Sequence, residues 1–162
     1  MFDLGTYLPY LINRAGVRIA TAFTQELVRF DISLAMWRVL AVLWQHGGQR
    51  LGEVADRTSM EASTLSRLIG QMQAKGLVSR VRSGADARAV AVSLTARGRT
   101  LTRKIIPIAL RYETVSVQGF TSAETDTLKR LLVRVYANMA AFDEVPSPRR
   151  RSNGKAAPAT PP

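Results

Sequence analysis

Short hydrogen-bonding side chains gather on one side of the segment between residues 61 and 75. At the helical period that side carries three hydroxyls, one guanidinium and one amide: Ser63, Thr64, Ser66, Arg67 and Gln71. The opposite side is an apolar stripe: Leu65, Leu68, Ile69 and Met72. Arg and Gln donate to guanine and adenine edges, and short neighbours let a helix enter a major groove about 12 Å wide. The pattern favours a helix that reads duplex DNA, with an ordinary solvated helix face as the alternative.

The next segment adds cations to an expected β-hairpin. Residues 77–82 alternate apolar and basic side chains, residues 83–87 have turn composition, and residues 89–94 place three apolar side chains on one face. The charged candidates here are Arg80, Arg82, Asp86 and Arg88. A polar helix followed by a basic hairpin predicts a winged helix.

A preceding short element must position the reading helix. Its apolar edge consists of Leu51, Val54 and Ala55. Residues 57–59 separate the two elements, which is helix-turn-helix spacing. Ser59 is the expected N-cap of the second helix, Glu61 favours the positive end of its dipole, and Gly76 is expected to end it.

The positive charge is concentrated on this region. Residues 50–104 hold 11 Lys and Arg against 4 Asp and Glu, whereas residues 105–145 hold 4 against 5. Most of the chain's formal charge of +11 therefore lies on the expected winged helix and the segment after residue 145. Because neutralised phosphates release counterions, we expect double-stranded DNA as the partner.

The segment before the winged helix is expected to form two helices. A helical stripe covers residues 6–30, and residues 31–33 break it. Ser33 can cap a second helix through about Gln45, which ends at the glycines 47–48.

Two further helices are expected after the hairpin. Thr95 opens a long helix through about Val117, with a kink at Pro107, which lacks an amide proton for a helix hydrogen bond. Residues 121–124 form a capping box before a strongly amphipathic last helix.

The expected fold class is mainly α with a small β-hairpin wing, that is, a winged helix-turn-helix plus long dimerisation helices. The expected parts are an N-terminal dimerisation helix (1–33), a DNA-binding region (34–98), C-terminal dimerisation helices (99–145) and a disordered basic tail (146–162).

The long helices carry more apolar surface than a small winged helix covers, so a homodimer is expected, with a helical cap on a monomer as the alternative. Two-fold symmetry sets the reading helices roughly 34 Å apart and predicts a pseudo-palindromic operator.

The chain resembles the MarR family of bacterial transcriptional regulators from about residue 6 to residue 143. The similar segments are 32–40, 63–68, 76–80, 86–88 and 94–98. The resemblance implies a homodimeric DNA-binding regulator in which Arg88 enters the minor groove. Where the family often has an acidic-basic-Leu-acidic run, residues 70–73 read Gly-Gln-Met-Gln, so the base contacts there stay open.

The resemblance also implies an effector cleft between dimerisation helices and winged helix. Aromatic and cationic candidates on the corresponding helices are Tyr10, Arg14, Arg18, Phe23, Trp37, Arg38, Trp44, Arg111 and Tyr112. Arginine orients a carboxylate or phosphate and aromatic rings stack on a ring, so a small anionic aromatic acid or an aryl-CoA thioester is the expected effector. Each residue has core packing or an interface as its alternative.

Catalysis and metal binding find little support. The chain has one histidine, His46, and no cysteine, which excludes a thiol switch. Its carboxylates Glu53, Asp56 and Glu61 fit helix starts and ion pairs, and we expect no cofactor. The longest uncharged run, residues 39–49, is too short for a membrane span, and the early charges argue against a signal peptide, so a cytoplasmic protein is expected.

The sequence thus predicts a sequence-specific repressor that an aromatic acid or aryl-CoA molecule releases from its operator. A nonspecific architectural DNA-binding protein without an effector is the alternative, favoured only by the charge.

Overall fold

The computed structural model describes residues 2–82 and 90–143 of the 162-residue chain. These residues are mainly helical, with one small antiparallel sheet, which confirms the expected fold class. The chain divides into two compact units, Met1–Gln118 and Gly119–Pro162. The functional division made from the sequence stays a prediction, and its tail, residues 146–162, lies outside the described residues.

The first unit begins with two helices joined by a tight turn. Helix α1 is Leu8–Val28 and α2 is Leu34–His46. Asp31 has a left-handed backbone (φ 55°), which stops one helix before the next begins. The Ser33 side chain accepts a hydrogen bond from the Met36 amide at 3.2 Å, so its expected role as a cap is confirmed.

The helix-turn-helix consists of α3 (Leu51–Thr58) and α4 (Ala62–Ala74), joined by residues 59–61. The expected N-cap role of Ser59 is wrong. Ser59 is instead the left-handed end of α3 (φ 54°), and Glu61, without a side-chain cap bond, precedes α4. The chain needs two more residues because Met60 packs against the core before α4 can start. Gly76 (φ 67°) ends α4 as expected.

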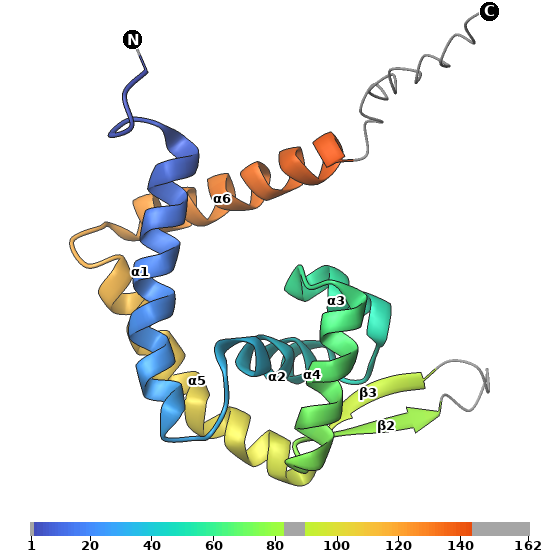
Figure 1. Cartoon of the computed structure of the whole chain (residues 1–162). Coiled ribbons are helices and arrows are strands. Elements are labelled where there is room, and N and C mark those ends of the chain that lie inside the picture. The colour runs from blue at the N-terminus through green and yellow to red at the C-terminus, as the bar shows by residue number, and fades with distance from the viewer. Residues whose placement is uncertain (1, 83–89, 144–162) are drawn as a thin grey trace, which may run out of the picture. The chain divides into compact units, whose positions relative to one another are not determined.

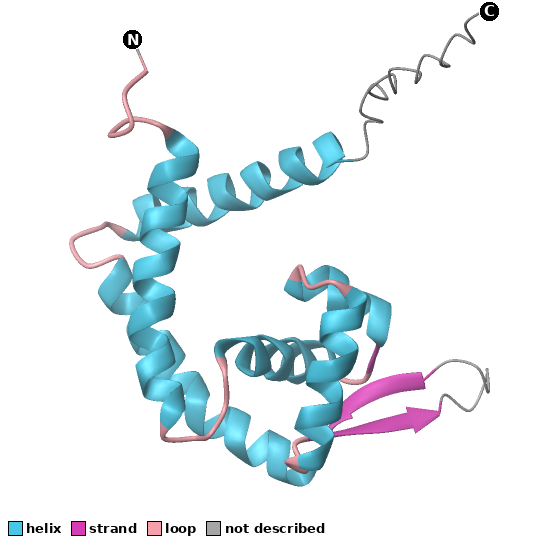
Figure 2. Ribbon diagram, in the orientation of Figure 1, coloured by secondary structure: helices cyan, strands magenta, loops and turns pink. Residues whose placement is uncertain are grey.

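The hairpin is β2 (Val78–Arg82) and β3 (Val90–Leu94), antiparallel with Val78 opposite Leu94 and Arg82 opposite Val90. A third strand, β1 (Gln49–Arg50), pairs with the other edge of β3, giving the order β1-β3-β2. Figure 1 shows the sheet beside α3 and α4, and Figure 2 colours its strands magenta. Strand β1 could not be predicted from the sequence, because two residues are too few to show an alternating pattern.

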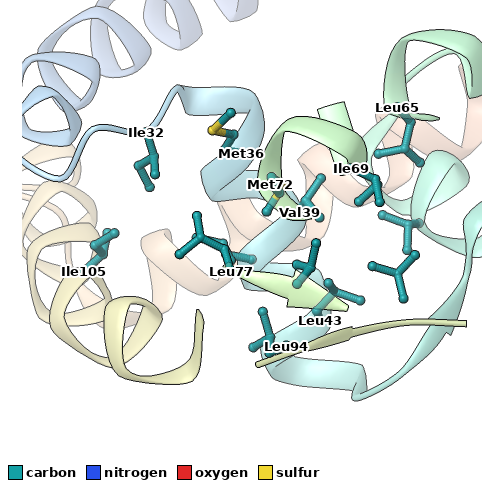
Figure 3. Close-up of a cluster of buried hydrophobic side chains, with 14 of the residues drawn as sticks. Ile32, Met36, Val39, Leu43, Leu65, Ile69, Met72, Leu77, Leu94 and Ile105 are labelled. Atoms are coloured by element: carbon teal, nitrogen blue, oxygen red, sulfur yellow. The ribbon is translucent and has the colours of Figure 1, made fainter. Parts of the chain in front are cut away.

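The hydrophobic core of the first unit lies where α2, α4 and the hairpin meet (Figure 3). Val39 and Leu40 of α2 belong to this core together with Leu65, Ile69 and Met72 of α4, and all five are 0% exposed. Burial of one such side chain contributes about 1.5 to 3 kcal/mol, so the inward stripe fixes how α4 can be oriented.

Helix α5 (Ala96–Ser116) is tied to the base of the hairpin. The Thr95 hydroxyl accepts from the Gly98 amide at 3.0 Å and donates to the Gly76 carbonyl at 2.7 Å. Gly98 lies so close to the backbone of Leu77 that an added Cβ would be 2.0 Å from the Leu77 carbonyl oxygen. Pro107 lies inside α5, which stays helical on both sides of it, and Figure 1 shows the helix curving along its length.

The second unit contains α6 (Ser122–Asp143). Thr121 and Glu124 form the expected capping box: the Thr121 amide donates to Glu124 Oε2 at 2.8 Å, and the Glu124 amide donates to Thr121 Oγ1 at 3.2 Å. The Thr121 amide and the Thr121 hydroxyl, which both donate to Glu124 Oε2, hold the pKa of Glu124 below its ordinary value. None of the described helices has the length and apolar character that crossing a membrane demands.

Candidate nucleic-acid interface

Helix α4 separates its apolar and polar side chains onto opposite faces. Ser63, Thr64, Arg67 and Gln71 are exposed, and Ser66 is half-buried. The inward face is sealed by three fully buried side chains, Leu65, Ile69 and Met72. The outward face is therefore narrow and polar on a helix that cannot roll without exposing its core residues.

The carboxyl end of α4 is fixed to other elements. The Leu77 amide donates to the Met72 carbonyl at 2.9 Å, and the Gly76 amide donates to the Gln73 carbonyl at 2.8 Å. Lys75 forms an ion pair with Asp31 in the turn between α1 and α2. The helix is thus held at the end opposite its exposed first turn, whose amides have no side-chain cap bond from Glu61. Backbone amides at a helix start attract phosphate.

The hairpin carries several arginines, and the structure describes the side chains of only some of them. Arg80 is exposed on β2, opposite Val92 of β3. The backbone of Arg82 is the last of β2, and its side chain lies outside the described ones. Asp86 and Arg88 lie outside the described residues altogether, so their expected DNA contacts stay predictions.

Three of the effector candidates form an aromatic cluster between α1, α2 and α5. The Phe23 ring meets Trp37 and Tyr112 edge to face, with ring centroids 5.8 and 5.4 Å apart. Phe23 is only 5% exposed, and the Tyr112 hydroxyl donates to the Ala22 carbonyl at 3.1 Å. These contacts are the core packing that the sequence left as an alternative.

A cavity of about 580 Å³ lies between α2 and α5. Trp37 and Trp44 line it, as does Glu113, together with apolar residues of α5 that the sequence analysis did not single out, such as Ile106 and Leu110. The apolar spacing on α5 could have pointed to them. The described lining includes no arginine or lysine.

The remaining effector candidates do not line this cavity. Arg38 and Arg111 are exposed on α2 and α5, Arg14 and Arg18 are exposed on α1, and Tyr10 is half-buried there. The structure of one chain therefore brings two of the nine candidates, Trp37 and Trp44, to one cavity.

His46 lies at the exposed carboxyl end of α2, where its Nε2 is 3.3 Å from Arg57 Nη1. Since a guanidinium only donates, that nitrogen accepts. Within residues 2–82 and 90–143 no group of three His, Cys, Asp or Glu side chains could hold a metal ion.

Known proteins are similar to this chain in sequence and fold. A model of the MarR family matches residues 30–89. The structure of a transcriptional regulator of the MarR family from Silicibacter pomeroyi is 32% identical, with a TM-score of 0.76 over 84% of this chain and 92% of that one.

Two further relatives are similar over most of their length. The structure of Bordetella bronchiseptica BpsR, described for the regulation of its DNA binding by 6-hydroxynicotinic acid, is 26% identical, with a TM-score of 0.76 over 84% of this chain and 97% of that one. The transcriptional repressor IacR of Pseudomonas putida is 25% identical over 130 residues, which are 80% of this chain and 78% of that protein.

Proposed function

Because the chain belongs to the MarR family of transcriptional regulators, which are not enzymes, we propose that it is a dimeric repressor of a pseudo-palindromic operator, released by a small aromatic acid. DNA binding is the part of this function that the relatives support directly. The observation that carries the proposal of sequence-specific DNA reading is the outward face of α4, which is narrow, polar and exposed around Arg67. A regulator that acts on chromosomal DNA works in the cytoplasm, which we propose as its compartment.

The geometry of α4 supports base reading rather than attraction to phosphates alone. Three fully buried side chains orient the helix, and the Lys75–Asp31 pair holds its carboxyl end. Arg67 stands near the middle of the exposed face between short neighbours, so its guanidinium can reach a guanine edge without a bulky side chain blocking approach.

Exposed apolar side chains support the homodimer. In the single chain, Leu8, Leu11 and Val17 of α1 are 41 to 56% exposed. In the second unit, Leu131, Val133 and Met139 of α6 are 46 to 68% exposed. Helical surfaces of this kind are covered in a stable protein, and a symmetric partner covers them on both copies at once. The two α4 helices then address two half-sites of the operator.

The cavity between α2 and α5 supports the proposal that a small aromatic effector binds to the protein. Its volume of about 580 Å³ is within the usual range for small-molecule sites, and Trp37 and Trp44 offer ring faces for stacking. BpsR, a relative of this chain, responds to an aromatic carboxylic acid. The carboxylate needs a cation, and we propose Arg14 or Arg18, which an exposed α1 can bring to the cavity of a second copy. An effector that selects one spacing of the two α4 helices can change operator affinity about 5- to 150-fold.

DNA recognition can be tested with duplexes selected from a random library and from the DNA upstream of the protein's own coding region. Fluorescence anisotropy with excess competitor DNA should give a discrete complex for selected duplexes. We expect Arg67→Ala to cost about 1 to 3 kcal/mol on the selected site and to relax preference among sites, whereas Arg88→Ala weakens all duplexes alike.

The matched control is Arg29→Ala, which removes one exposed charge from the end of α1. Equal losses on every duplex for Arg67→Ala and Arg88→Ala would contradict base reading by α4. Loss of all complexes under competitor DNA would favour the architectural alternative.

Effector binding can be followed through the two tryptophans, which are the only ones in the chain and both line the cavity. We expect 6-hydroxynicotinic acid, benzoic acid or benzoyl-CoA to quench their fluorescence, to raise Tm and to lower operator affinity. Trp44→Ala should weaken binding. An aromatic acid that raises Tm while operator affinity stays constant would refute release by this ligand.

A further inference from the structure

A second cleft, of about 390 Å³, lies at the carboxyl end of α4. It is formed by the turn between α1 and α2, the end of α4 and the first turns of α5, and it shares no lining residue with the α2–α5 cavity. Phe30 and Leu101 give it apolar walls, and both also pack against the core. The walls suit an apolar body of small size.

The polar lining of this cleft is strongly biased towards positive charge. Lys75, Arg97 and Lys104 bring three cations, Asp31 brings one carboxylate, and Thr100 adds a hydroxyl. The Lys75–Asp31 pair is the only ion pair that the described residues form in the cleft. Arg97 and Lys104 are left without a carboxylate within ion-pair distance among the described residues, so the cleft has two cations to spare.

The position of the cleft separates these cations from the expected DNA contacts. Helix α4 has 13 residues and is therefore about 20 Å long. Its exposed polar residues begin at Ser63 in the first turn, whereas Lys75 follows its last turn. An anion in the cleft would bind at the end of α4 opposite its first turn, where backbone amides attract phosphate.

We propose that this cleft binds a phosphate monoester, a dianion carried on a small apolar body. The two spare cations match its charge, Arg97 can bind two phosphate oxygens at once, and the Thr100 hydroxyl can donate to a third. A monoanionic carboxylate would leave one of these cations unmatched.

An anion bound in the cleft competes with Asp31 for Lys75. Its carboxylate occupies Lys75 and repels an incoming phosphate, so the anion binds at the expense of the Lys75–Asp31 pair. That pair ties the end of α4 to the α1–α2 turn, and its loss frees the end of the DNA-reading helix. Bound phosphate monoester therefore lowers DNA affinity, a consequence that rests on the proposed function.

Binding can be measured on the full-length protein without DNA, by calorimetry with phenyl phosphate, inorganic phosphate and phenol. We expect saturable binding of one phenyl phosphate per chain, weaker binding of inorganic phosphate and none of phenol. Arg97→Gln and Lys104→Gln should each weaken phenyl phosphate at least fivefold. Arg103→Gln removes an exposed charge beside Lys104 on the same helix but outside the cleft, and should change the affinity less than twofold.

Asp31→Asn is the most specific test, because Asn tolerates the left-handed backbone at this position. Removing one negative charge about 5 Å from a phosphate dianion in water should tighten binding roughly fifteenfold. No saturable binding, an equal loss in Arg103→Gln, or unchanged affinity in Asp31→Asn would overturn the site. If phenyl phosphate binds as expected but DNA affinity does not fall, the site stands and the coupling to α4 is wrong.

Discussion

A methyl group added at Gly98 tests how closely α5 approaches the base of the hairpin. The Cβ of Gly98→Ala would lie 2.0 Å from the Leu77 carbonyl oxygen and 3.0 Å from its carbon. Both partners are backbone, and the same carbonyl accepts from the Thr95 amide at 3.1 Å, so it cannot turn away without losing that bond. The distance between the added Cβ and the Leu77 oxygen must grow by about 1.4 Å, from 2.0 to 3.4 Å, to restore van der Waals contact.

The expected cost follows from two opposing effects. Overpacking of this kind costs about 1 to 3 kcal/mol, while replacing a helical glycine by alanine returns about 0.5 to 1 kcal/mol. We therefore expect Gly98→Ala to lower the free energy of unfolding by about 1 to 2 kcal/mol and Tm by roughly 2 to 8 °C. Operator binding should fall as well, because the junction positions the hairpin relative to α4.

Gly70→Ala is the matched control. Gly70 is exposed on α4 with no atom within 4 Å of an added Cβ, so the same substitution should stabilise the DNA-free protein by about 0.5 to 1 kcal/mol. Circular dichroism melts of both variants at one protein concentration give the comparison. If Gly98→Ala melts at or above the Tm of Gly70→Ala, the close approach at Leu77 does not constrain the fold and the reasoning fails.

Three further predictions concern single hydrogen-bonding groups. Thr95→Ala should lower the free energy of unfolding by about 1 to 2 kcal/mol in denaturant titrations, because it removes the cap of α5 and the bond to the Gly76 carbonyl. Thr95→Ser should retain both bonds. Equal losses in the two variants would count against the cap. Tyr112→Phe should cost about 0.5 to 1.5 kcal/mol, through its bond to the Ala22 carbonyl alone, and leave the ring packing intact; an unchanged melt would show that this bond contributes nothing. Hydrogen bonds from Thr121 hold the pKa of the Glu124 carboxyl below its ordinary 4.5. The stabilisation of α6 by this carboxylate should therefore be complete above about pH 4.5 and disappear as the pH falls through the lowered pKa. Glu124→Gln should flatten that part of the pH dependence of helix content, and an acid transition unaltered by the substitution would exclude this carboxyl.

Features that depend on neighbours within one helical turn followed from the sequence. Ser33 caps α2, Thr95 caps α5, and Gly76 ends α4, as expected. Each role requires only the residue's own side chain or backbone freedom and an amide or carbonyl a few positions away. The exception was Ser59. Its residue type favours an N-cap, but it forms the left-handed end of α3, and Met60, which packs against the core, lies between it and α4.

Features that join distant parts of the chain could not be foreseen residue by residue. A helical wheel assigns Phe23, Trp37 and Tyr112 to apolar faces, but only the packing of three helices shows that the Phe23 ring contacts the other two rings and that Trp37 also lines the α2–α5 cavity. In the same way, the wheel left it open whether Arg14 and Arg18 meet a ligand, and in one chain they lie exposed on α1.

The sequence by itself determined the order of the helices and the hairpin, the two faces of α4 and the concentration of positive charge on residues 50–104, since periodicity, capping and composition are local properties. The tertiary structure alone decided the pairing of β1 with β3, the contact of Gly98 with Leu77, and the cleft that collects Lys75, Arg97 and Lys104. These arrangements bring together residues more than 20 positions apart, and their distances depend on how buried side chains from several helices fill one core.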